Sequence, residues 1–298
     1  MFQGISVVEF QKFFKSEDDC KQYLFDLKWR DGYICRRCNC KESHKGKTRF
    51  HVRCKRCAYD ESITAHTMFH KLKIPLLKAF GMCFRLSVRK KGMSTMELSK
   101  EFSINQKSSW LFKRKTQEAM ISSGKHPLKS KVEVDEILIG GPEKRKRGRT
   151  KGEKKLIVIA IEKVKGNKIG RAYGEVIEQA SGECFRPFFD KYIDRDNAQV
   201  STDGWRGYLP LESEFEIRQK QSKGGKGFPD LHIIIMNLKS WIRGIHHKVS
   251  ERFMNGYLSE FFFRFNRRNF LTSIWHKLIE RFMGSSPYSY KEIGRAHV

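Results

Sequence analysis

The sequence is poor in acidic residues. Asp and Glu number 33 among 298 residues, against 60 Lys and Arg, so the formal net charge is +27. Such an excess argues against an ordinary enzyme of small molecules and indicates a polyanionic partner. Nucleic acid is the first candidate, and an acidic membrane surface is the alternative.

Long hydrophobic runs are also missing. No stretch approaches the roughly 18 apolar residues of a membrane span. Residues 1–5 do not open a basic segment followed by an apolar run, the pattern of a signal peptide. We therefore expect a soluble, cytoplasmic protein without a membrane partner. The hydrophobic fraction of 39% still suffices for a core, and the length allows about two domains with a small extra module.

Cysteine, by contrast, is concentrated in one place. Cys35 and Cys38 form one C-x-x-C pair, and Cys54 and Cys57 form a second pair after 15 intervening residues. Two such pairs are typical of a zinc ribbon, in which four thiolates close a tetrahedral structural site. Cys40 could replace Cys38 in this site. Redox cysteines, or a ribbon that has lost its metal, are the alternatives.

Basic residues surround the two cysteine pairs. A compact zinc module with this much positive charge suits contacts with DNA phosphates. The alternative is a solvated basic surface. The candidate DNA-binding residues here are Arg36, Arg37, Lys55 and Arg56.

The rest of the N-terminal half is predicted to be helical. Residues 1–30 form a helical lead-in to a ribbon at 31–65, and residues 70–122 form a helical region. Ser94 and Glu97 make a capping box that begins one helix, and a second follows from about 106 to 120. This is helix-turn-helix spacing, which would direct a basic second helix toward DNA. Its candidate DNA-binding residues are Gln106, Lys107, Lys113 and Arg114. Two packed helices without a DNA role are the alternative.

After a linker at 123–130, the order of elements indicates an α/β domain at 131–285. We predict strands at 132–140, 155–161 and 169–177, a helix at 182–193, a strand at 198–202, and then further helices. This order is the layout of a ribonuclease-H-like fold. The predicted fold class is thus a ribonuclease-H-like catalytic domain preceded by a zinc ribbon and a helix-turn-helix.

Two acids in this domain are candidate metal ligands. Asp135 lies beside Glu136 in the first strand, where neighbouring residues point to opposite faces, and Asp203 directly follows the fourth strand. The ribonuclease-H-like layout brings an acid of the first strand next to an acid at the end of the fourth. Two adjacent carboxylates repel unless a cation bridges them, which favours Mg²⁺ or Mn²⁺. A strand-end acid that merely reaches solvent is the alternative.

The later helices carry the candidates for a third ligand of this metal. His232 and Lys239 lie seven residues apart, two helical turns, and share a face. Asn237 lies about 140° around the helix from His232. Glu260 is the acid near the end of the fold that could replace a missing third carboxylate. A helix-end histidine and a solvated lysine are the alternatives for His232 and Lys239.

Several long motifs, in order, resemble one family. They cover residues 27–38, the second cysteine pair, 91–99, 132–136 with 140–141, 202–208, 237–244 and 257–268. The chain resembles a bacterial insertion-sequence transposase of the zinc-ribbon, ISXO-like group in the DDE superfamily. The resemblance implies binding to the terminal inverted repeats, followed by metal-dependent DNA strand cleavage and strand transfer into target DNA.

The resemblance also implies roles for particular residues. Asp135 and Asp203 match the first two metal-binding acids. Members place Glu, Asn or His at the third position with a Lys two turns later, so His232 with Lys239 fits best and Asn237 is the second choice. A homo-oligomer on DNA, in the bacterial cytoplasm and on the nucleoid when bound, is expected. The alternatives are a catalytically defective zinc-ribbon DNA-binding protein from a decayed element, or a ribonuclease-H-like nuclease without strand transfer.

The last seven residues, 292–298, match the peptide that a common sequencing adapter encodes. We expect this tail to be an artefact without a structural role.

Overall fold

The computed structural model describes residues 1–141, 154–220, 227–246 and 249–295. The chain divides into two compact units, one formed by residues 1–120 with 270–298 and the other by residues 121–269. Among the helices that the structure describes, none has both the length and the apolar character needed to cross a membrane.

The first unit begins with two short helices, α1 (Val7–Phe13) and α2 (Glu17–Lys28). Each starts with a reciprocal capping box, formed by Ser6 and Glu9 in α1 and by Ser16 and Asp19 in α2. These caps satisfy backbone N–H groups that have no partner within the helix. The predicted helical lead-in is therefore present, and its break lies at Ser16.

A small antiparallel sheet follows, with strands β1 (Ser43–Lys45), β2 (His51–Cys54) and β3 (Asp60–Ser62) in that order. Its buried core consists of Tyr33, Cys35, Val52 and Cys54. Modules with so little buried apolar surface usually need a metal or a cross-link to fold. The fold of the ribbon is thus consistent with the clustered cysteines.

The helical region consists of α3 (Leu76–Val88), α4 (Thr95–Glu101) and α5 (Gln106–Ala119). The predicted capping box of Ser94 and Glu97 begins α4, and the Asn105 side chain caps α5. A short turn joins α4 to α5, and these two helices pack on each other. The predicted pair of helices is therefore present.

The unit is completed by α9 (Leu271–Gly284) and α10 (Tyr290–Arg295), from the far end of the chain. Trp275 of α9 is fully buried, and its ring centroid lies 5.1 Å from that of Phe14 and 5.4 Å from that of Phe80. The Trp275 indole N–H also donates to the Phe80 carbonyl at 3.2 Å.

This packing differs from the expected domain boundary at residue 285. An amphipathic helix can bury its apolar face on any matching surface, so the sequence of α9 did not identify its partner. Of the expected artefactual tail, residues 292–295 lie in α10, and residues 296–298 lie outside the described residues.

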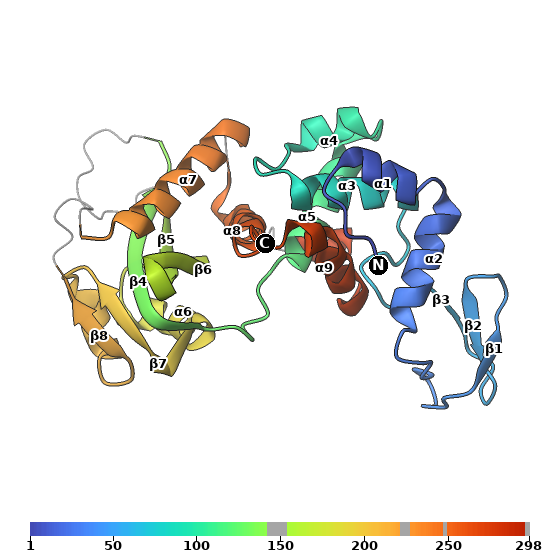
Figure 1. The fold of residues 1–298 in the computed structure, drawn as a ribbon, viewed down its shortest axis with the longest axis horizontal. Coiled ribbons are helices and arrows are strands. Elements are labelled where there is room, and N and C mark those ends of the chain that lie inside the picture. Colours follow the sequence, from blue (N-terminus) through green and yellow to red (C-terminus); the bar gives the residue numbers. More distant parts are fainter. Residues whose placement is uncertain (142–153, 221–226, 247–248, 296–298) are drawn as a thin grey trace. The chain divides into compact units, whose positions relative to one another are not determined.

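The second unit is built on a five-stranded sheet (Figure 1). Its strands are β4 (Leu128–Ile139), β5 (Lys155–Val164), β6 (Lys168–Ile177), β7 (Ile193–Thr202) and β8 (Glu216–Gln219), in the order β6-β5-β4-β7-β8. β5 runs antiparallel to β4 and β6, while β4, β7 and β8 are parallel. This is the ribonuclease-H-like arrangement, as predicted. The short strand β8 was not predicted, because its four residues show no buried alternation.

Helices cover both faces of the sheet. On one face, α6 (Gly182–Tyr192) and the 3₁₀ helix η2 (Arg206–Leu211) share a core with Val132, Val134 and Val158. On the other, α7 (Pro229–Ile245) and α8 (Glu251–Phe265) share a core with Ile137 and Ile159. A further 3₁₀ turn, η1 (Lys165–Asn167), joins β5 to β6. A strand buried on both faces reads as a continuous apolar run, which β5 shows.

The packing of α9 predicts that Trp275→Ala destabilises the first unit by about 3–5 kcal/mol, because it leaves a cavity among aromatic rings. Phe270→Ala is the matched control, since the Phe270 side chain is 66% exposed. Chemical denaturation with hydrogen-exchange mapping would measure both variants. Equal losses in the two variants, or lost protection confined to residues 121–269, would contradict the assignment of α9 to the first unit.

Candidate catalytic and zinc-binding sites

The two cysteine pairs lie in turns with the same geometry. The backbone N–H of Cys35 donates to the Cys40 carbonyl and that of Cys54 to the Tyr59 carbonyl, each at 2.9 Å. Asn39 and Ala58 follow the second cysteine of each pair and have positive φ angles of 57° and 52°. Left-handed conformations are uncommon for residues other than glycine, so the shared geometry marks two equivalent metal knuckles.

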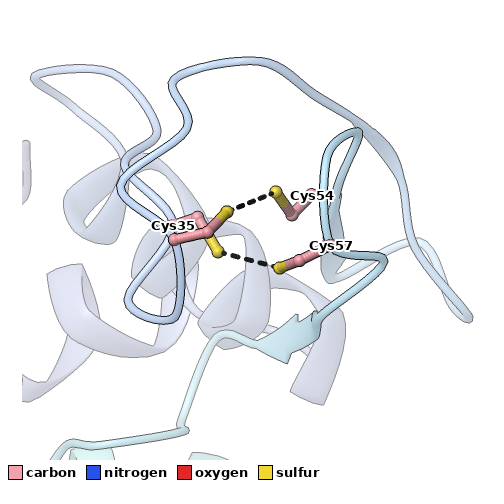
Figure 2. A group of neighbouring side chains, drawn as sticks. Cys35, Cys54 and Cys57 are labelled. Carbon is pink, nitrogen blue, oxygen red and sulfur yellow. Dashed lines mark hydrogen bonds between the residues drawn. The ribbon is translucent and has the colours of Figure 1, made fainter.

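The four sulfurs of the knuckles converge on one point (Figure 2). The Sγ atoms of Cys35 and Cys57 are 3.5 Å apart, as are those of Cys38 and Cys54, and all four lie within 4.8 Å of one another. Four sulfurs at about 2.3 Å from a tetrahedral zinc would be roughly 3.8 Å apart. The cluster therefore fits a closed zinc site.

The local backbone favours the thiolate form of Cys35. Burial acts to raise the pKa of Cys35, but the N–H groups of Arg37 and Cys38 outweigh it and lower that pKa to about 6. Cys40 lies outside the four-sulfur group, and its Sγ accepts from the Glu42 N–H at 3.4 Å.

The basic residues of the ribbon have separate surroundings. Arg36 lies 3.6 Å from the buried carboxylate of Glu61, and Lys55 lies 3.3 Å from the exposed carboxylate of Glu42. The Arg37 guanidinium lies over the ring of Tyr59, whereas Arg56 is exposed. All four candidate side chains of the ribbon therefore remain at its surface.

The predicted DNA-binding residues of α5 divide into two groups. Gln106 and Lys107 are exposed at its N-terminus. Lys113, however, is fully buried and donates to the Met93 carbonyl at 2.6 Å. Arg114 is 6% exposed and donates to the Gln117 side chain at 2.7 Å. The prediction that Lys113 and Arg114 face DNA does not fit this structure, since the face of α5 that carries them packs within the unit.

In the second unit, strand register places the two predicted acids side by side. β4 and β7 are parallel neighbours, and Glu133 pairs with Ser201. The same register, continued two residues further, sets Asp135 of β4 beside Asp203 at the end of β7. Asp135 Oδ1 accepts from the Glu136 N–H at 2.9 Å, and Asp203 Oδ1 accepts from the Trp205 N–H at 3.1 Å.

A third carboxylate, Glu136, joins this pair, although sequence reasoning did not assign it a role. One oxygen each of Asp135, Glu136 and Asp203 lie within 4.8 Å of one another. The Tyr208 hydroxyl donates to Glu136 Oε2 at 2.8 Å, and the Tyr208 ring stacks on Phe185. Burial is the main cause that raises the pKa of Tyr208 well above its usual value, and the negative charges of Glu136, Asp135 and Asp203 add to this effect. Tyr208 therefore remains a proton donor that orients Glu136.

The signal for Glu136 was present in the sequence but could not be used. Strand alternation correctly predicts that Asp135 and Glu136 leave β4 on opposite faces. Their carboxylate oxygens nevertheless lie within 4.8 Å of each other, just beyond Glu133, where the pairing of β4 with β7 ends. The hydrogen bond from Tyr208, which lies 72 residues later, becomes visible only in the folded chain.

Helix α7 brings His232 to the same acids. His232 Nε2 lies 3.9 Å from Asp135 Oδ2, a separation too long for a hydrogen bond. This nitrogen is buried and has no hydrogen-bond partner in the described part of the chain. Two ligands of one divalent ion, each about 2.1 Å from it, lie roughly 3–4 Å apart. The orphaned nitrogen and the carboxylates therefore fit a divalent metal.

The start of α7 is held to the sheet by charged groups. Asp230 forms an ion pair with Lys163 of β5. Glu133 of β4 accepts from the backbone N–H of Leu231; burial raises the pKa of Glu133, and Lys163 partly offsets that effect. These contacts fix the helix turn that carries His232.

The other candidates on these helices lie in different places. Lys239 is partly buried; burial and then Arg243 lower its pKa, while the charge of Asp135 acts to raise it. Asn237 is exposed. Glu260 is 1% exposed and accepts from Arg264 at 2.7 Å. It lies outside the acidic group formed by the described residues.

The fold and these sites define a class of protein: a zinc ribbon and a helical pair joined to a DDE-type, ribonuclease-H-like domain. Comparison with protein families agrees. The chain matches the ISXO2-like transposase domain over residues 127–266 and the transposase zinc-ribbon domain over residues 15–60. Together the two matches cover more than half of the chain, which therefore belongs to the ISXO2-like zinc-ribbon transposases. No curated protein matches the chain significantly.

The knuckle geometry predicts one bound zinc per chain, which metal analysis of the purified protein would measure. Cys35→Ser should lose that zinc and the hydrogen-exchange protection of residues 31–65, because three thiolates no longer close the site. Cys40→Ser, the matched control, should retain both. Zinc loss in Cys40→Ser, or its retention in Cys35→Ser, would refute the four-ligand assignment.

Proposed function

We propose that this protein is an active DNA transposase that binds the terminal inverted repeats of its element and performs metal-dependent strand cleavage and strand transfer. The observation that carries the proposal is the meeting of Asp135, Glu136 and Asp203 beside the orphaned nitrogen of His232. Membership of the transposase family supports phosphodiester chemistry at this place in the fold.

The proposed metal is Mg²⁺ or Mn²⁺, held by Asp135, Asp203 and His232, with Glu136 as an additional ligand. When bound, such an ion polarises a phosphoryl oxygen and lowers the pKa of bound water. Oxygen-rich ligands suit these hard cations. A neutral histidine leaves less negative charge at the site than a third acid would, and Glu136 compensates for that difference.

The protein's own residues position the site and the DNA. Strands β4 and β7 hold Asp135 and Asp203 on a rigid sheet, and Tyr208 orients Glu136 through its hydroxyl. Lys239 lies on the same face of α7 as His232, two turns further along the helix. We assign Lys239 the binding of a DNA phosphate next to the scissile bond. The exposed Asn237 has no place in this arrangement.

DNA binding is supported by the charge of +27 and by the basic surface of the zinc ribbon. We propose that Arg36, Arg37, Lys55 and Arg56 contact DNA phosphates, as do Gln106 and Lys107 at the exposed start of α5. Two element ends must be joined to one target, so we propose that the protein acts as a homo-oligomer on the bacterial chromosome, in the cytoplasm.

The proposal predicts that Asp135→Asn or Asp203→Asn abolishes cleavage and joining of end-containing DNA while leaving DNA binding intact. Each change removes one negative charge from the metal ligands without altering the shape of the side chain. Gel assays of cut and joined products with Mg²⁺ or Mn²⁺ measure the effect. The control is Asp196→Asn, an exposed acid of the same unit.

The outcomes separate the rival functions. Wild-type joining by either variant would refute the catalytic assignment. Cleavage without joined products by the wild-type protein would instead indicate a nuclease, and binding without cleavage would indicate a defective transposase.

The third ligand can be tested by metal binding without catalysis. His232→Ala and Glu136→Gln should each weaken Mn²⁺ affinity, and Tyr208→Phe should weaken it by about 10-fold because Glu136 loses its orienting donor. Titration calorimetry of the zinc-loaded protein measures these affinities. Asn237→Ala should bind Mn²⁺ like the wild type; a larger loss in Asn237→Ala than in His232→Ala would reverse the choice of ligand.

A further inference from the structure

The first unit contains a cavity that is not part of the site proposed for strand cleavage and strand transfer. It has a volume of about 660 Å³ and lies between the ribbon turn at residues 48–51, the residues that follow β3, and the segment 71–76 that leads into α3. All of its lining residues belong to the first unit. The volume is within the range of small-ligand sites, about 300–1,000 Å³. We call it the ribbon groove.

The rim of the ribbon groove is cationic. Lys21, Arg49, Lys71 and Lys73 all line it. Lys21 is paired with Asp18, and Arg49 lies over the Phe50 ring. Lys71 and Lys73 are exposed, and neither has an ion-pair partner within the described ranges. These two lysines can therefore neutralise an incoming anion without first breaking an ion pair.

The one carboxylate among the described lining residues, Glu17, is already engaged. Its two oxygens accept from the backbone N–H groups of Leu76 and Leu77, at 3.0 and 2.8 Å. Those N–H groups belong to the first turn of α3, so Glu17 caps that helix from the preceding α2. The groove thus keeps a net positive rim.

We call six of the apolar lining residues, taken together, the floor of the ribbon groove. They are Phe50, Ile63, Phe69, Leu72, Ile74 and Pro75. A contact with the phosphates of a closed duplex would require only the cationic rim. The combination of an apolar floor and a cationic rim matches a nucleotide, whose flat base stacks on apolar side chains while its phosphates lie on lysines.

The backbone at the rim is held in an uncommon conformation. Lys71 has a positive φ of 50°. Non-glycine residues pay a cost of order 1 kcal/mol or more there, and such residues cluster at ligand clamps. The strained residue Lys71 is one of the cationic lining residues, and the apolar lining residue Leu72 follows it directly.

We propose that the ribbon groove binds an unpaired nucleotide of a DNA strand, with its base on the apolar floor and its neighbouring phosphates on Lys71 and Lys73. The inference rests on the proposed function in that DNA is the partner. It adds a preference for locally unpaired DNA, which arises wherever a strand is cut or an end is opened.

The test uses the full-length, zinc-loaded protein and two fluorescent probes. One is a fully paired 30-base-pair duplex and the other is the same duplex with a 12-nucleotide oligo-dT extension. Wild-type protein should bind the extended probe more tightly, on the order of tenfold for one stacked base. Lys71→Ala with Lys73→Ala should remove most of that preference. It should also reduce the dependence of log affinity on log salt by about 1.4 for the extended probe.

Two further variants complete the design. Leu72→Glu should remove the preference by placing a carboxylate on the floor, and its zinc content and thermal unfolding establish that it folds. The matched control, Lys12→Ala with Lys90→Ala, removes two exposed lysines of the same unit that do not line the groove. This control should retain the wild-type preference for the extended probe.

Photo-crosslinking locates the bound strand directly. With 5-iodouracil in the extension, crosslinks should map to residues 48–51 or 69–76. If crosslinks fall only elsewhere, or the groove variants lose no more preference than the control, the groove proposal is overturned while the proposed transposase function stands. If wild-type protein binds neither probe, both proposals fail.

Discussion

The parallel pairing of β4 with β7 is the constraint on which the rest of the second unit depends. The register that pairs Glu133 with Ser201 brings Asp135 beside Asp203. Two carboxylates at this distance repel each other, and only a rigid, buried sheet can hold them together without a cation. The apolar run of β5 on one side and the two helical layers on the faces supply that rigidity. Moving the register by one residue would turn every side chain of β7 to the opposite face.

The helix α7 provides the second constraint, because its position decides which side chain meets the acids. Asp230 and Lys163 join the helix start to β5, and Glu133 accepts from the Leu231 backbone. His232, one residue later, is thereby held 3.9 Å from Asp135. Asp135 meets His232 of α7 on one face of the sheet. Tyr208 of η2, which covers the other face, donates to Glu136 and orients it. The site thus unites groups from both faces at the end of the strand pairing.

The first unit contains a small module, the zinc ribbon, that has only a small hydrophobic core. The ribbon buries few apolar residues besides its cysteines, and four converging thiolates take the place of a larger core. The helices around α3 are completed by α9, whose Trp275 fills the space between aromatic rings from the beginning of the chain. Both ends of the sequence therefore belong to the first unit, and the second unit, residues 121–269, is inserted between them in the sequence.

The sequence by itself determined most of the helices and strands of the second unit and singled out the two cysteine pairs, Asp135 and Asp203, which the fold brings together. Local signals such as the C-x-x-C spacing, the capping box of Ser94 and Glu97, and the apolar run of β5 specify their own structures, because the interacting residues are neighbours along the chain. The tertiary structure alone decided the burial of Lys113, the return of α9 to the first unit, and the meeting of Glu136 with Tyr208. Each of these depends on contacts between segments whose sequences permit many partners. Which partner is chosen follows from the packing of the whole unit, and no local pattern encodes it.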